Sequence, residues 1–118
     1  LADFAAGYST EEETAESIHD TYQKTGYVMD THTAVAAHVC GQYRAKSGDQ
    51  TKCVIASTAS PYKFVKSVMS AIDAENANAD EFDLLPKLQE VSGVPMPQAI
   101  KDILDAIDRF VYFENRKK

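Results

Sequence analysis

The sequence has no tryptophan, only two cysteines in 118 residues, and no long hydrophobic run. Its apolar stretches are short: Ala34–Ala37, for example, is interrupted at once by His38. A helix that crosses a bilayer needs about 20 predominantly apolar residues, so a membrane span is excluded. Hydrophobic residues still make up 44% and charged residues 25% of the chain, which excludes a disordered tail and predicts one folded domain or part of one.

Positive charge is also scarce. Twelve Lys and Arg residues stand against eighteen Asp and Glu residues, and the net charge is −6. Because proteins bind phosphate groups mainly through Lys and Arg, we expect no nucleic-acid partner and no membrane partner. The one basic cluster, Arg116–Lys118, is short and is interpreted as a solvated tail.

The two cysteines, Cys40 and Cys53, are too few for a disulfide framework, and their apolar neighbours favour small buried side chains. The sequence shows no secretory signal, so a reducing, cytoplasmic location is the default expectation. The first residue is Leu1 rather than Met, which hints that the chain is a piece of a longer protein.

Capping signals and apolar spacing divide most of the chain into helices. Two capping boxes, Ser9–Glu12 and Thr10–Glu13, overlap at the start of the first helix. The sequence predicts helices over about 10–25 and 31–46, one beginning at Pro61, one beginning at Asp80 or Asp83 and ending at Gly93, and one carrying the apolar stripe Ile100–Phe110.

Cys53–Ala56 is the best candidate strand, because it is short, apolar throughout and β-branched at its centre. Such a run is typical of a central strand in a parallel sheet. One strand cannot form a sheet, so either Tyr27–Met29 pairs with it or its neighbours lie outside this chain. The predicted fold class is therefore α/β: residues 1–118 form a mostly helical, incomplete piece with one or two short strands.

Ligands in open α/β sheets bind beyond the carboxyl ends of the strands, where this chain has Ser57, Thr58 and Ser60. Hydroxyls there can bind an anion or an aromatic nitrogen. Lys63 can supply a cation or, if desolvated, a Schiff-base amine. The alternative is structural: Ser60 caps the next helix and Lys63 points to water.

Asp30 and His32, at the start of the helix 31–46, are the second candidate group. They either cap that helix through a buried hydrogen bond or shape a site. His32 and His38 are six positions apart, about 240° around a helix, and do not converge on a metal ion. The hydrolase motif G-x-S-x-G is missing and the glycines are isolated, so a phosphate-binding loop would lie elsewhere.

Two segments together resemble threonine synthase. Gly26–Ala36 (GYVMDTHTAVA) is similar to the family's G-Y-x-x-D-P-H-T-A-V-A segment. Val54–Phe64 (VIASTASPYKF) is similar to the family's strand followed by S-T-A-[SH]-P-x-K-F, and Ser9–Glu13 resembles its S-x-E-E-T lead-in. Thr31 and Val65 depart from the pattern, because each replaces a family proline.

The resemblance implies a fold-type II pyridoxal-phosphate enzyme, a lyase that converts O-phosphohomoserine and water to threonine and phosphate in the last step of threonine biosynthesis. The chain would be the C-terminal portion of the cofactor-binding α/β domain. The Schiff-base lysine and the phosphate loop would belong to an earlier part of the enzyme. The chain would therefore hold no catalytic residue, bind no pyridoxal 5'-phosphate by itself and be inactive alone.

The resemblance also implies roles for individual residues. Thr58, and as second choice Ser57, would meet the pyridine nitrogen of the cofactor. Lys63 would help place the substrate phosphate or set the electrostatics of the site. Asp30 and His32 would form its wall or brace it, and no residue would bind a metal.

Two alternatives remain open at this point: another fold-type II pyridoxal-phosphate lyase, and a small acidic helical module that binds a partner through the Ile100–Phe110 stripe. The partners of the leading hypothesis are O-phosphohomoserine and the remainder of the chain. If the piece is free, we expect self-association through the edge of Cys53–Ala56 or the apolar helix 31–46.

Overall fold

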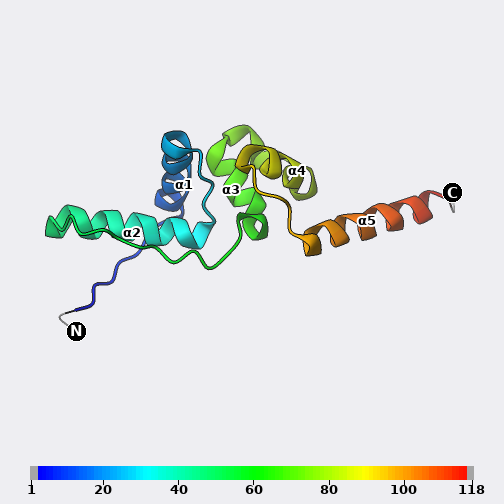
Figure 1. Ribbon diagram of the computed structural model, residues 1–118. Coiled ribbons are helices and arrows are strands. Elements are labelled where there is room, and N and C mark those ends of the chain that lie inside the picture. Colours follow the sequence, from blue (N-terminus) through cyan, green and yellow to red (C-terminus); the bar gives the residue numbers. More distant parts are fainter. Residues whose placement is uncertain (1–2, 117–118) are drawn as a thin grey trace.

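Helices dominate the structure, a computed structural model that describes residues 3–116 (Figure 1). In chain order the elements are α1 Glu11–Thr25, α2 Thr31–Ser47, the 3₁₀ helix η1 Pro61–Phe64, α3 Val65–Ile72, the 3₁₀ helix η2 Ala74–Asn78, α4 Glu81–Ser92 and α5 Gln98–Arg116. No strand occurs within residues 3–116. The predicted α/β class is therefore right in its helices and wrong in its one or two strands.

Short-range signals set the helix ends. Of the two overlapping capping boxes, the Thr10–Glu13 box is present: the Thr10 hydroxyl accepts from the Glu13 amide at 3.2 Å, and the Glu13 carboxylate accepts from the Thr10 amide at 2.8 Å. Asp80, rather than Asp83, caps α4. Three helices end at a glycine whose φ lies between 67° and 74°, a conformation that suits a residue without Cβ: Gly26, Gly48 and Gly93.

The hydrophobic core lies around α3, which packs against α1, α4 and η2, while α1 also packs against α2. The best-buried apolar side chains, each at most 2% exposed, come from the four helices α1 to α4: Ile18, Ala34, Val68, Met69, Leu84 and Leu88. Their removal from water is the main favourable term that holds α1 to α4 together.

Two hydrogen bonds fix the link between α4 and α5. The Tyr62 hydroxyl, on η1, donates to the Val94 carbonyl at 2.6 Å, and the Met96 amide donates to the Gln89 side chain at 2.8 Å. Tyr62 is only 3% exposed, and this burial raises the pKa of its phenol above the ordinary value. The buried phenol therefore stays neutral and keeps donating to the linker.

The helices α2 and α5 project away from the core toward opposite ends of the molecule (Figure 1), which measures 66 × 28 × 23 Å. The radius of gyration is 17.9 Å, whereas a compact domain of this length has about 13.5 Å. The predicted stripe on α5 is half core and half surface, because Ile100 and Leu104 pack against the core while Phe110 is 67% exposed. Within the described residues, no helix is long and apolar enough to span a membrane.

The residues that follow α2 turn and run back along it (Figure 1). Side-chain contacts between the two fix their register: Arg44 Nη2 donates to the Thr51 carbonyl at 2.6 Å, Cys40 Sγ lies 3.0 Å from Cys53 Sγ, and Thr33 Oγ1 lies 3.0 Å from Ser57 Oγ. The helix rises about 16 Å between its outer contacts. Six extended residues span about 20 Å, so residues 51–57, here called the extended segment, lie nearly fully stretched.

The extended segment is nevertheless not a strand, and the predicted strand at Cys53–Ala56 is wrong. A strand needs a second backbone with unpaired amides and carbonyls, whereas the segment lies beside a helix whose backbone groups already pair with one another. Val54 is accordingly 89% exposed. Cys53 is exposed too, which corrects the expectation that both cysteines are buried. Tyr27–Met29 joins α1 to α2 without pairing.

The core assignment predicts unequal effects of one substitution at two isoleucines. Ile18 is 1% exposed and Ile103 is 52% exposed. Ile18→Ala should lower the free energy of unfolding by about 2–5 kcal/mol, because it leaves a cavity among α1, α3 and their neighbours. Ile103→Ala should lower it by less than about 1 kcal/mol. Urea unfolding followed by circular dichroism measures both, and equal losses would contradict this core.

Candidate functional site

Asp30 is the centre of the candidate site. Its carboxylate is 1% exposed and caps α2, since Oδ1 accepts from the His32 amide at 2.9 Å and from the Thr33 amide at 3.2 Å. Oδ2 accepts a short hydrogen bond from the Thr33 hydroxyl. The predicted capping role of Asp30, with a buried hydrogen bond, is confirmed.

The charge of this carboxylate is stabilised by its surroundings. Burial by itself raises the pKa of Asp30, but the hydrogen bonds from the Thr33 hydroxyl, the Thr33 amide and the His32 amide, together with the nearby His32 ring, lower it below the ordinary value of 3.8. Asp30 is therefore ionised at neutral pH and accepts hydrogen bonds without donating any.

Ser57, at the end of the extended segment, joins the same network. Its Oγ lies 3.0 Å from Thr33 Oγ1 and 3.4 Å from Asp30 Oδ2. Each hydroxyl has one proton, and the proton of Thr33 goes to Asp30. Ser57 in turn donates its proton to Asp30 Oδ2, so it can accept a further hydrogen bond but has no proton left to donate.

Thr58 comes next in the chain and is exposed. Within residues 3–116 its hydroxyl makes no hydrogen bond, so its proton is available to an acceptor outside the chain. Ser60 then caps η1 by accepting from the Tyr62 amide at 3.3 Å, as predicted. Thr58 thus lies between Ser57 and Ser60, whose hydroxyls both take part in hydrogen bonds, while its own hydroxyl is uncommitted.

The His32 ring closes one side of the network. It is 63% exposed, its Nδ1 lies 3.6 Å from Asp30 Oδ1, and its ring centre is 5.1 Å from that of Phe64 at an angle of 51°. This contact connects the start of α2 with η1, where Lys63 is exposed. Asp30, His32 and Ser57 are therefore brought together, while the Lys63 side chain faces solvent.

Thr33 belongs to the segment that the sequence singled out at the start of α2, but sequence reasoning gave it no role of its own. Its buried hydroxyl bridges Asp30 and Ser57. The available signal was its position three residues after the N-cap Asp30, where a side chain faces the cap. Thr31, the departure from the family's proline, occupies the first position of α2. The amide at that position needs no helical partner, so proline and threonine are both compatible with the helix start.

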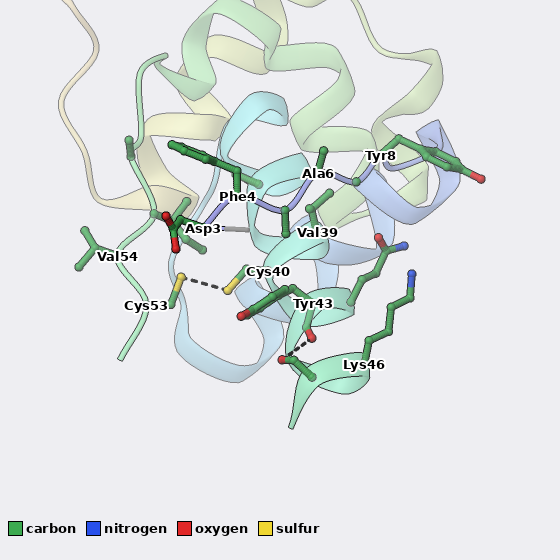
Figure 2. Close-up of a pocket in the computed structure, with 17 residues that line it drawn as sticks. Asp3, Phe4, Ala6, Tyr8, Val39, Cys40, Tyr43, Lys46, Cys53 and Val54 are labelled. Carbon is green, nitrogen blue, oxygen red and sulfur yellow. Dashed lines mark hydrogen bonds between the residues drawn. The ribbon is translucent and has the colours of Figure 1, made fainter. Parts of the chain in front are cut away.

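A large groove lies elsewhere, on the outer part of α2 (Figure 2). It has a volume of about 1130 Å³ and is bounded by residues 3–8, by α2 and by the extended segment. None of the five predicted site residues lines it. Among the described residues, no group of three or more His, Cys, Asp or Glu side chains is placed to hold a metal ion.

The Asp30 network predicts an acid-sensitive stability. Because the folded pKa lies below the ordinary 3.8, its contribution is complete above that value and is lost as the pH falls through the folded pKa. Asp30→Asn should cost about 1–3 kcal/mol at pH 7 and flatten the decline in stability as the pH falls below about 4. Urea unfolding across this pH range measures it.

Asp80→Asn is the matched control, because Asp80 caps α4 from an exposed position, where its carboxylate accepts from the Phe82 amide. It should cost less than about 1 kcal/mol. If Asp30→Asn loses free energy of unfolding at low pH as steeply as the parent chain does, the proposed role of the buried carboxylate is disproved.

Comparison with known proteins agrees with the sequence resemblance. The family profile "Threonine synthase, C-terminal" matches residues 33–117. The mouse protein "Threonine synthase-like 1" is 34% identical over 95 residues, which are 80% of this chain and 12% of that protein. Threonine synthases of Corynebacterium glutamicum and Saccharomyces cerevisiae are 31% and 32% identical, over 88% and 72% of this chain and 22% and 18% of their own lengths.

The chain thus spans between about an eighth and about a fifth of the length of these curated relatives. The match covers Thr33, Ser57, Thr58 and Lys63 and starts directly after His32. Because the profile covers well over half of the residues, the chain belongs to the threonine synthase C-terminal family.

Proposed function

We propose that the chain is the C-terminal part of a threonine synthase, a lyase that converts O-phosphohomoserine and water to threonine and phosphate. Family membership supports the enzyme class. The chain spans 12–22% of the relatives' lengths, so the rest of such an enzyme would supply the lysine that carries the cofactor and the loop that binds its phosphate. By this proposal the chain alone is inactive.

The single observation that carries the proposal for this site is the distribution of protons around Asp30. Thr33 and Ser57 both direct their protons into the Asp30 network, whereas the exposed Thr58 keeps its own. A pyridine nitrogen without a proton needs a donor, and Thr58 fits that need. Pyridoxal phosphate supplies an electron sink when bound, and a neutral hydroxyl partner sets how strong that sink is.

The other residues have positioning roles in this proposal. Asp30 holds Ser57, and through it the end of the extended segment, at the start of α2. Its charge is already satisfied by four donors, so it does not compete with Thr58 for the ring nitrogen. His32 packs on Phe64 and forms the wall of the site. The exposed Lys63 is available to the phosphate of the substrate.

A second lyase of the same cofactor class is the alternative, and one observation favours it: the mouse relative bears the name "Threonine synthase-like 1" rather than threonine synthase. A panel of phosphorylated and unphosphorylated hydroxy-amino acids, offered to the longer protein, separates the two. The interaction-module hypothesis is less favoured, because the family profile extends through α5 and its apolar stripe.

The proposal predicts a specific loss in the longer protein that contains this chain. Thr58→Val should lower the rate of phosphate release from O-phosphohomoserine at least about tenfold, because a donor to the cofactor ring is removed. It should also shift the visible absorbance of the bound cofactor. The 118-residue chain alone should release no phosphate and show no such absorbance.

Thr58→Ser is the matched control, since it retains the hydroxyl and should keep most of the activity. Ser57→Ala should affect stability more than the absorbance of the cofactor, because the Ser57 proton points into the Asp30 network. Full activity in Thr58→Val, or robust activity of the 118-residue chain alone, would refute the proposal.

The free chain is expected to self-associate, because the groove beside the extended segment is apolar and open. Phe4, Tyr8 and Val54 line it, and they are 81%, 79% and 89% exposed. Sedimentation velocity should show a mass that rises with concentration, and Val54→Lys should reduce that rise. If the chain stays monomeric at all concentrations, this contradicts the expectation that the apolar groove is covered by the remainder of a longer chain.

A further inference from the structure

The two cysteines lie opposite each other across the groove edge (Figure 2). Cys40 is in the middle of α2 and Cys53 is in the extended segment, thirteen residues later. The Cys40 thiol donates to the Cys53 sulfur, and the two Sγ atoms are 3.0 Å apart. Both thiols are free, and both are accessible to solvent, Cys53 more than Cys40.

The closeness of the two sulfurs is held from both sides. On one side Arg44 Nη2 donates to the Thr51 carbonyl at 2.6 Å, and on the other Thr33 and Ser57 are in contact at 3.0 Å. The register of the extended segment on α2 therefore does not depend on the cysteines. A disulfide requires its sulfurs at about 2.05 Å, so closure needs a shift of about 1 Å, which rotation of the exposed Cys53 side chain can provide.

We propose that Cys40 and Cys53 form a reversible disulfide when the protein meets a peroxide. The Cys53 thiolate attacks one peroxide oxygen, the O–O bond breaks, and Cys53 becomes a sulfenic acid as hydroxide leaves. The Cys40 thiolate then attacks the Cys53 sulfur, the S–S bond forms, and a second hydroxide leaves. With the two thiol protons the products are one disulfide and two waters, and the two electrons that reduce the peroxide come from the sulfurs.

The order of the two thiols follows from their surroundings. The hydrogen bond to Cys53 and, to a smaller extent, burial raise the pKa of the Cys40 thiol above its ordinary value. Cys53 is the more exposed of the two. The oxidant therefore reaches Cys53 first, and Cys40 resolves the sulfenic acid from 3.0 Å away.

The disulfide would join the extended segment covalently to α2, four residues before Ser57. In the reduced chain only side-chain contacts hold that segment, whereas the oxidised chain cannot let it leave the helix. This consequence concerns the segment itself, so it stands or falls independently of the proposed enzymatic function.

Treatment of the 118-residue chain with hydrogen peroxide tests the proposal. The intact mass should fall by about 2 Da, as two hydrogens are lost, and both thiols should disappear from a colorimetric titration. Peptide mapping should find Cys40 joined to Cys53, and dithiothreitol should restore both thiols. The oxidised chain should melt at least about 5 °C higher, because the cross-link closes a loop in the unfolded chain.

The variants Cys40→Ser and Cys53→Ser are the matched controls. Neither should show the 2 Da loss or the rise in melting temperature, and the remaining thiol should stay titratable or form dimers between chains. Peroxide treatment that yields only such dimers, or sulfinic acids without an internal cross-link, overturns the proposal. An internal cross-link that leaves the melting temperature unchanged overturns its bracing of the extended segment.

Discussion

The carboxylate of Asp30 is the interaction on which this end of the molecule depends. A buried charge is costly unless each of its oxygens is paired, and here amides, a threonine hydroxyl and a serine hydroxyl provide the pairing. The same group starts α2 and holds the end of a segment that lies 27 residues later in the chain. The start of α2 and the docking of the extended segment therefore depend on the same carboxylate.

This dual role of Asp30 explains how hydroxyl-bearing residues of similar chemistry come to differ in their hydrogen bonding. Three neighbouring hydroxyl-bearing residues, Thr33, Ser57 and Thr58, differ little in composition. They differ in where their protons go, because an ionised acceptor-only group orients the first two and leaves the third. A neutral side chain at Asp30 would erase that distinction, even if the backbone kept its path.

Sequence reasoning predicted the parts of the fold that short-range signals determine. Thr10 with Glu13, Asp30 and Ser60 each mark a helix start through contacts within a few residues, and glycines mark the ends. The strand at Cys53–Ala56 was wrong because a strand is a property of two backbones, and the neighbour that the segment has is a helix. The apolar pattern of Cys53–Ala56 indicates that other residues cover this segment. It does not indicate whether those residues belong to a neighbouring strand or to a helix.

In the candidate site, too, short-range features could be predicted from the sequence, whereas long-range contacts could not. The sequence located Asp30 and His32 at a helix start and Ser57 and Thr58 after an apolar run, and the resemblance to threonine synthase implied their roles. It did not show that Thr33 links them, because that link depends on how far the extended segment travels back along α2. The proximity of Cys40 and Cys53 depends on the same register and was likewise invisible in their apolar neighbours.

The elongated outline has a practical consequence for studies in solution. A molecule of 66 × 28 × 23 Å experiences more frictional drag than a sphere of equal mass, so its hydrodynamic radius is large for 13.0 kDa. A single copy will leave a gel-filtration column early, at the volume of a heavier globular standard. Elution volume alone would therefore report a dimer where light scattering reports one chain.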